Sequence, residues 1–280
     1  MEKENKKTIA VLLTVHNRKD TTLCCLEKLF ANNLPSNVCL NVYLVDDGCT
    51  DGTSEAVSSA FPKVNLIKGN GNLYWNRGMW TAWEEAAKND FDYYLWLNDD
   101  TNLYPYAIST LLEASEAQND VTIIVGATES SNHSIITYGG RNDGKIPVPN
   151  GMLAEVSYFN GNIVLVPSYV YHKLGNMDPY FTHSKGDFDY GLRAKKEGVK
   201  IYQAEKILGV CDSHPSIDKW CNPNVKFVER WRALWKPNGM PPHETFHLDR
   251  KHKGLLIACI HYVSTISRCC IPMLWSKRNK

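Results

Sequence analysis

The segment Thr8 to Gly48, TIAVLLTVHNRKDTTLCCLEKLFANNLPSNVCLNVYLVDDG, decides the fold class. Thr8 to Val15 is a short apolar run, as expected of a strand buried on both faces. Asp20 to Asn32 carries its apolar residues at helical spacing, and a second apolar run, Asn41 to Val45, ends at Asp46-Asp47-Gly48. The order strand, helix, strand predicts a parallel sheet with right-handed crossovers, and therefore an α/β fold.

The same alternation continues along the chain. Further strands are predicted at 64–68, 93–97, 122–127, 156–166 and 200–204, and further helices at 54–61, 78–89, 106–117 and 187–198. Polar clusters follow two of the strands, at Asp46-Asp47-Gly48 and at Asn98-Asp99-Asp100. Open α/β sheets bind ligands in the crevice beyond the carboxyl ends of their strands, so these clusters are candidate binding residues.

Composition excludes several classes of protein. With 43% hydrophobic and 22% charged residues the 280-residue chain is an ordinary globular protein, and its formal charge of +1 gives no electrostatic basis for nucleic-acid binding. The nine cysteines form no CxxC pair, and the N-terminal lysines and apolar run lead directly into TVHNR without a small-residue cleavage site. We therefore expect free thiols, no signal peptide and a cytoplasmic location.

The acidic pairs have a functional and a structural interpretation. Asp99 and Asp100 offer the oxygen ligands that Mg²⁺ or Mn²⁺ prefers, with substrate phosphates completing the shell, whereas Asn and Asp are also frequent turn residues. Asp47, beside Asp46, could accept hydrogen bonds from a nucleobase or ribose, or could cap the following helix. Each motif alone leaves both interpretations open.

Two further segments combine polar chemistry with a helix start. Gly69 to Gly78, GNGNLYWNRG, offers backbone N–H groups and an arginine to phosphate or ribose oxygens, although it lacks the Walker lysine of a P-loop. Asp187 and Asp189, in GDFDYGLR, open a predicted helix that also carries Arg193. A carboxylate there can act as a general base, or can simply stabilise the helix N-terminus.

Taken in order, TVHNR, VDDGCTDGT, GNGNLYWNRG, LWLNDD and GDFDYGLR resemble the family 2 glycosyltransferases, and the resemblance covers roughly Thr8 to Ser216. It implies a GT-A fold, which is a Rossmann-like, mostly parallel sheet flanked by helices, and an inverting transfer of a sugar from a nucleotide-diphosphate donor. The implied nucleotide-binding residues are Thr14, His16, Arg18, Asp46, Asp47, Asn72, Asn76 and Arg77.

The resemblance also assigns the metal and the base. Asp99 and Asp100 match the metal-binding DxD motif, with Asn98 in the place of its first aspartate, and His214 resembles a later histidine that completes some metal sites. Asp187 matches the aspartate that deprotonates the acceptor, and Asp189 is the second choice. Gly186 stands where many members have a glutamate. A divalent cation, Mg²⁺ or Mn²⁺, is therefore the expected cofactor.

The implied function is hexosyl transfer to a carbohydrate or lipid-linked saccharide in cell-surface polysaccharide synthesis, with UDP- or dTDP-sugars as donors. Because Asn98 and Gly186 replace acidic residues, the competing hypothesis is a nucleotide-sugar binding module without activity. Turnover distinguishes the two.

His243-Glu244-Thr245-Phe246-His247 spells HExxH, which on a helix would bind zinc as in a metallopeptidase. It follows Pro241-Pro242 in a region of weak helical periodicity, so a zinc peptidase is the less favoured alternative function, which bound zinc or chelator-sensitive proteolysis would support.

The last part of the chain has a different composition. We predict a catalytic domain over residues 1–221 and a helical C-terminal extension over residues 222–280. Gly254 to Trp275 is largely apolar, with Arg268 its only charged residue, and Lys251, Lys253, Lys277, Arg278 and Lys280 flank it. This pattern predicts either an amphipathic helix on the inner face of the cell membrane or a helix packed on the catalytic domain.

Overall fold

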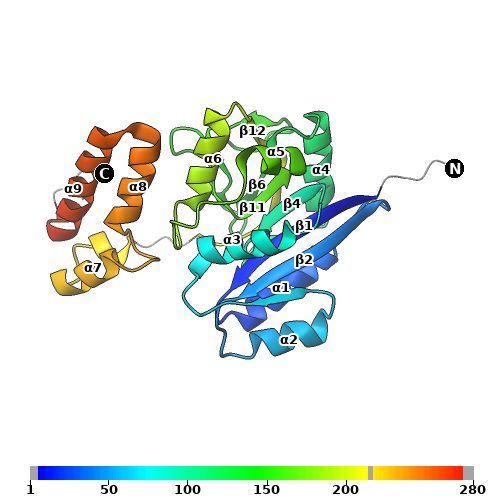
Figure 1. The fold of residues 1–280 in the computed structure, drawn as a ribbon, viewed down its shortest axis with the longest axis horizontal. Helices are drawn as coiled ribbons and strands as arrows, with labels where there is room; N and C mark the ends of the chain where they lie inside the picture. The colour runs from blue at the N-terminus through cyan, green and yellow to red at the C-terminus, as the bar shows by residue number, and fades with distance from the viewer. Residues whose placement is uncertain (1–5, 214–216, 274–280) are drawn as a thin grey trace.

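The computed structural model describes residues 6–213 and 217–273, which form a sheet with helices on both faces and a helical unit beside it (Figure 1). The strands are β1 (Lys7–Val15), β2 (Val38–Asp46), β3 (Asn65–Lys68), β4 (Tyr93–Leu97), β5 (Asn102–Leu103), β6 (Ile123–Glu129), β7 (Ile136–Tyr138), β8 (Gly140–Arg141), β9 (Ala154–Glu155), β10 (Tyr158–Phe159), β11 (Ile163–Pro167) and β12 (Ile201–Val210). The helices are α1 (Lys19–Phe30), α2 (Thr53–Ala60), α3 (Tyr74–Ala86), α4 (Ala107–Ala117), α5 (Ser168–Leu174), α6 (Gly186–Lys196), the 3₁₀ helix η1 (Lys219–Cys221), α7 (Phe227–Leu234), α8 (Pro242–Lys253) and α9 (Leu255–Cys270).

The main sheet has the order β3-β2-β1-β4-β11-β6-β12-β5, with β7 added at β6 and β9 at β12. β3, β2, β1 and β4 are parallel, β11 runs antiparallel to β4 and β6, and β12 is parallel to β6. The predicted α/β fold, with a mostly parallel sheet flanked by helices, is therefore confirmed.

Alternate residues of β1 enter two different cores, because successive side chains of a strand point to opposite faces. Ile9 and Leu13 pack with residues of α1 and α4, whereas Ala10 and Leu12 pack with residues of α3 and α6. Burial on both faces explains why the strand is continuously apolar rather than alternating. It also fixes the strand end, from Thr14 onward, at the edge where the polar motifs lie.

The predicted elements agree with the structure except at a few boundaries. The segment predicted as one strand, 156–166, is divided into β10 and β11 because the backbone N–H of Gly161 donates to Asp187 rather than to a neighbouring strand. The helix predicted to begin at Gly78 begins at Tyr74, since Asp47 accepts the N–H groups of its first turn. β12 continues to Val210, well beyond the predicted 200–204.

The HExxH segment is helical despite its weak helical periodicity. Pro242 is the first residue of α8, a position where its missing N–H costs nothing, so the helix runs through His243 and His247. α8 and α9 form an antiparallel pair beside α6 and α7 (Figure 1). Across the described residues, no helix has both the length and the apolar character needed to cross a membrane.

Candidate active site

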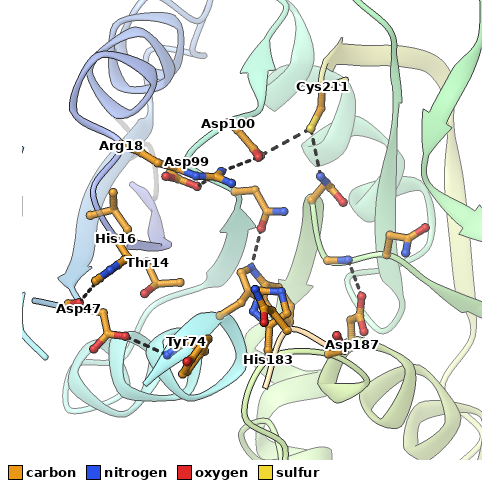
Figure 2. Close-up of a pocket in the computed structure, with 18 of the residues that line it drawn as sticks. Thr14, His16, Arg18, Asp47, Tyr74, Asp99, Asp100, His183, Asp187 and Cys211 are labelled. Carbon is orange, nitrogen blue, oxygen red and sulfur yellow. Dashed lines mark hydrogen bonds and ion pairs between the residues drawn. The ribbon is translucent and has the colours of Figure 1, made fainter. Parts of the chain in front are cut away.

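A cavity of about 740 Å³ opens at the carboxyl ends of the parallel strands, where a ligand is expected to bind (Figure 2). Its walls come from the ends of β1, β2 and β4, the start of α3, the segment before β11 and the start of α6. The lining side chains that could bind a ligand or take part in a reaction are Thr14, His16, Arg18, Asp47, Tyr74, Trp75, Asn98, Asp99, Asp100, His183, Lys185, Asp187 and Cys211.

Asp47 organises one end of this cavity. Its carboxylate accepts N–H groups from Gly71 at 2.8 Å and from Leu73 and Tyr74 at 2.9 Å each, and so caps α3. The Asp47 carbonyl accepts a hydrogen bond from Nδ1 of His16 at 2.6 Å. The glycine-rich segment and the loop after β1 are thereby attached to one residue, and the helix that Asp47 caps is α3 rather than α2, which directly follows it in the sequence.

The neighbouring Asp46 lies outside the cavity, contrary to its predicted contact with nucleotide. Its carboxylate accepts the N–H of Cys49 at 2.7 Å and the hydroxyl of Ser54. Burial works to raise the pKa of Asp46, but these hydrogen bonds outweigh it and hold the pKa below its usual value. Asp46 stabilises the β2–α2 turn.

Three residues of the glycine-rich segment also lie outside the cavity. Asn76 is fully buried and donates to the carbonyls of Asp178 and Phe181, while Arg77 donates to the carbonyl of Pro179. Asn72 is exposed, and its backbone N–H donates to Asn70. Asn72, Asn76 and Arg77, predicted to contact the nucleotide, therefore do not line the cavity, and Asn76 and Arg77 attach the 178–181 loop to α3.

Trp75 lies on the floor of the cavity between the acidic pair and Asp187. Its indole N–H donates to Oδ1 of Asn98 at 2.7 Å, and its ring edge meets the ring of the fully buried Trp96. A Cβ on Gly161 would come within 2.5 Å of the Trp75 ring, so only glycine allows this close approach. Asn98 thus orients an aromatic floor rather than contributing a carboxylate.

Asp99 and Asp100 lie beside the guanidinium of Arg18. Nη1 of Arg18 is 2.7 Å from Oδ2 of Asp100 and 3.3 Å from Oδ1 of Asp99. Burial raises the pKa of Asp99 to about 7 despite the nearby Arg18, and its Oδ2 atom is buried without a hydrogen-bond partner. Asp100 also accepts a weak hydrogen bond from the Cys211 thiol.

These carboxylates fit a hard divalent cation, because the unpartnered Oδ2 of Asp99 and the cavity-lining Asp100 supply oxygen ligands. Within the described residues no cluster of three or more His, Cys, Asp or Glu side chains could hold a metal, so substrate phosphates would have to complete the shell. The third predicted ligand, His214, lies outside the described residues.

Asp187 lies at the other end of the cavity, at the start of α6 (Figure 2). Its carboxylate accepts the N–H of Gly161 at 3.1 Å and its own neighbour's N–H, from Phe188, at 2.9 Å. Burial raises the pKa of Asp187 to about 6, against the lowering effect of these two hydrogen bonds. A carboxylate held in fixed orientation, with a pKa close to physiological pH, is suited to accept a proton.

Asp189, the second choice for the base, does not line the cavity. Its carboxylate is fully buried and lies 2.9 Å from Nε of Arg193, 2.8 Å from Nζ of Lys251 and 2.8 Å from Nε2 of His252. We call these four residues the Asp189 cluster. Arg193 belongs to α6, whereas Lys251 and His252 belong to α8, so the cluster attaches the C-terminal helices to the part of the chain that forms the cavity.

The HExxH residues form no zinc site. The His247 ring stacks on Tyr180 at a centroid distance of 3.9 Å, and His243 faces the ring of Trp235. Glu244 is buried and accepts the N–H of Thr182 at 2.9 Å. Although both histidines lie on a helix, their surroundings are those of packed aromatic residues.

Sequence reasoning missed His183 and Lys185, which also line the cavity. Both lie within the three residues before GDFDYGLR, so extending that motif by three residues would have included them. Lys185 adopts a positive φ of 74°, which turns the chain into α6. Cys211, at the end of β12, was considered only as a free thiol; all nine cysteines are indeed free.

Comparison with known proteins agrees with the fold. The family model described as Glycosyl transferase family 2 matches residues 10–166, more than half of the chain. The match ends before Asp187, so it does not include that residue. No curated protein matches the chain in sequence.

Crystal structures of S. aureus TarS are similar to this chain in fold. One has 15% identity and a TM-score of 0.56, and covers 75% of this chain and 37% of that chain. TarS 1-349 in complex with UDP-GlcNAc has 13% identity and a TM-score of 0.56, and the match covers 90% of this chain and 72% of that chain. The complex with UDP has 13% identity and a TM-score of 0.54, and the match covers 87% of this chain and 70% of that chain. The chain thus spans 37% of the longer TarS chain, and the likeness is one of fold.

Proposed function

Because the chain belongs to glycosyl transferase family 2, we propose that it transfers a sugar from a nucleotide-diphosphate donor to a hydroxyl of a carbohydrate or lipid-linked saccharide. One observation carries this proposal: a single cavity is lined by the Asp187 carboxylate, fixed by two backbone N–H groups, and, apart from it, by the Arg18–Asp99–Asp100 group. The TarS structures with UDP and UDP-GlcNAc favour a UDP-sugar donor, with dTDP-sugars as the alternative.

We propose an inverting single displacement. Asp187 accepts the proton of the acceptor hydroxyl, whose oxygen attacks the anomeric carbon from the face opposite the leaving group. As that C–O bond forms, the bond from the anomeric carbon to the diphosphate oxygen breaks, and the nucleoside diphosphate leaves. Thr14, His16 and Asp47 border the nucleotide, and Trp75 and Tyr74 border the sugar.

Asp99 and Asp100 would hold the divalent cation, Mg²⁺ or Mn²⁺, which supplies Lewis-acid neutralisation of diphosphate charge. Arg18 neutralises the same two carboxylates and is itself 43% exposed in its side chain, so it is able to turn toward a phosphate. If Arg18 turns toward a donor phosphate, the divalent cation would balance the charge of Asp99 and Asp100 in its place.

The experiment that tests the function is a screen of UDP- and dTDP-sugars for release of the nucleoside diphosphate, with Mn²⁺ or Mg²⁺ present. We expect release from at least one donor, with slow hydrolysis when no acceptor is added. Tight nucleotide binding without release from any donor or acceptor would instead support the binding module without activity.

Replacing Asp100 by Ala should weaken Mn²⁺-dependent binding of UDP by at least roughly tenfold, because a hard cation loses an oxygen ligand. Calorimetric titration of UDP with and without Mn²⁺ measures this. Asp90→Ala, at an exposed aspartate away from the cavity, is the matched control. Equal metal-dependent affinity in Asp100→Ala and the wild type would exclude ligation by Asp100.

We also propose that residues 222–280 are a separate extension and that α9 lies on a lipid surface, which would place transfer at the inner face of the membrane in polysaccharide synthesis. Leu256, Ile260 and Val263 are 75%, 56% and 62% exposed at helical spacing on α9, a helix without Asp or Glu. Lys251 and Lys253, which flank the apolar stretch, each pair with an aspartate and therefore offer less of their charge to anionic lipid. The apolar face would therefore supply most of the attraction, and Trp275 and the basic residues after it lie outside the described residues.

The combined variant Leu256→Ser, Ile260→Ser, Val263→Ser should lower the partition onto vesicles by at least roughly tenfold, because each buried aliphatic side chain contributes about 1.5–3 kcal/mol. Co-sedimentation with phosphatidylglycerol vesicles, compared with phosphatidylcholine vesicles, measures it. Val148→Ser with Met152→Ser, at exposed residues elsewhere, is the control. Unchanged vesicle binding, or a change of oligomeric state instead, would contradict a lipid surface as the partner of α9.

A further inference from the structure

Lys185 is a buried lysine whose ammonium group makes no direct ion pair among the described residues, since the carboxylates of Glu244, Asp187 and Asp249 act on its charge only from a longer distance. Its side chain lines the cavity, yet the residue is only 7% exposed. Among the described residues its one hydrogen bond is to a weak acceptor, Sδ of Met240, at 3.2 Å. An ammonium group has three donors and is costly to bury without partners, so at least one strong acceptor is lacking here.

A second group beside Lys185 lacks a partner in the same way. Nδ1 of His183 is buried without a hydrogen-bond partner, and the His183 ring lies edge-on to Tyr74 on the cavity wall. Burial, together with the positive charges of Arg18 and Lys185, lowers the pKa of His183, so the ring is neutral at pH 7 and able to hydrogen-bond a hydroxyl. Two unsatisfied polar side chains thus face one part of the cavity.

The position of Lys185 and His183 in the cavity indicates whether they face the donor or the acceptor. Thr14, His16 and Asp47 come from the ends of β1 and β2, at the proposed nucleotide end. Lys185 instead immediately precedes α6, two residues before Asp187, and touches Met240 of the α7–α8 loop. Lys185 also interacts with the charge of Asp187, so an acceptor that brings its hydroxyl to Asp187 would lie near Lys185.

We propose that Lys185 binds a negatively charged group, a carboxylate or a phosphate, carried by the acceptor. The proposal rests on the proposed glycosyl transfer and deepens it, because it makes the acceptor a uronic acid or a phosphorylated saccharide rather than a neutral sugar. The anion supplies the strong acceptors that the Lys185 ammonium lacks. It would replace the weak hydrogen bond from Lys185 to Met240 or be accepted beside it. His183 would orient a hydroxyl of the same sugar.

The test uses a matched pair of probes, methyl glucuronide and methyl glucoside, which differ in charge but little in shape. Titration of the wild-type chain, with and without UDP, should give at least roughly tenfold tighter binding of the glucuronide, the effect expected of one charge-assisted hydrogen bond. Glucose 6-phosphate is the second anionic probe, and a Lys185-dependent preference for either anion supports the proposal. Equal binding of all three probes to the wild type would overturn it, whether or not any variant folds.

Lys185→Met, which keeps the length of the side chain and removes its charge, should abolish the preference for the anionic probes, and Lys185→Arg should retain most of it. Lys63→Met is the control, since Lys63 is exposed and away from the cavity. A merely structural role of Lys185 would weaken glucoside and glucuronide binding alike, and that result would overturn the proposal.

The affinity for UDP distinguishes an anionic group on the acceptor from the diphosphate of the donor as the partner of Lys185. Lys185→Met should leave it within about twofold of the wild type, because a charge-assisted hydrogen bond to the diphosphate would give a far larger change. A loss of UDP affinity equal to the loss of glucuronide affinity would assign Lys185 to the donor and overturn an acceptor site. Failure of the wild type to release nucleotide would contradict the proposed function alone, since the probe preference is measured by binding.

Discussion

Asp187→Asn is expected to lower the transfer rate by about 10²- to 10⁴-fold, the usual contribution of a general base, while the affinity for UDP stays unchanged. The amide keeps the shape of the side chain but cannot take the proton of the acceptor hydroxyl. The two carboxylate oxygens accept the N–H groups of Gly161 and Phe188, whereas an asparagine side chain has only one oxygen acceptor. One of the two hydrogen bonds is therefore lost, and we expect the free energy of unfolding to fall by about 1 kcal/mol.

Single-turnover transfer and UDP titration distinguish this loss of chemistry from a loss of binding. Asp90→Asn is the matched control at an exposed site. Near-wild-type transfer by Asp187→Asn would remove the base from this end of the cavity, where no other described carboxylate lines the wall.

The pH dependence of transfer follows from the same residue. Burial raises the pKa of Asp187 to about 6, and the base acts only when it is deprotonated. The rate should therefore level off above about pH 7 and fall roughly tenfold per pH unit well below pH 6. The wild type should show this acid limb and Asp187→Asn should not, as a pH profile of nucleotide release in the presence of acceptor would measure.

The fold was predictable because its signals are local. Apolar runs followed by amphipathic helices determine the parallel half of the sheet, and carboxylates at strand ends determine where the cavity opens, as for Asp47 and Asp99. The antiparallel direction of β11 was not predictable, since a buried strand is apolar whichever way it runs.

The site was less predictable because the direction of a side chain depends on distant segments. Asp187 and Asp189 are two residues apart on one helix, so they point to different faces, and neither the spacing nor the residue type says which face meets the cavity. Asn76 and Arg77 bind backbone carbonyls about 100 residues away, a contact with no local signature. Lys185 and His183 became candidates only once burial and missing partners were visible.

Asp189→Ala is expected to lower the free energy of unfolding by about 3 kcal/mol, because removing one member of a buried ion pair leaves the other uncompensated. Asp189 is fully buried, and its carboxylate lies within 2.9 Å of Arg193, Lys251 and His252. We expect the low end of the usual range, since the Lys251 side chain is 31% exposed and can be partly hydrated after the change.

Urea unfolding measures the effect of Asp189→Ala, with Glu155→Ala as the control. Glu155 pairs with Lys200 on the surface, where an ion pair contributes less than about 1 kcal/mol. Because the Asp189 cluster joins α6 to α8, limited proteolysis should also cut near α8 sooner in Asp189→Ala than in the wild type. Asp187→Asn and Asp189→Ala thus separate two carboxylates of one motif: the first should lose rate and keep its fold, and the second should lose stability first. Wild-type stability with abolished transfer in Asp189→Ala would return the role of base to Asp189.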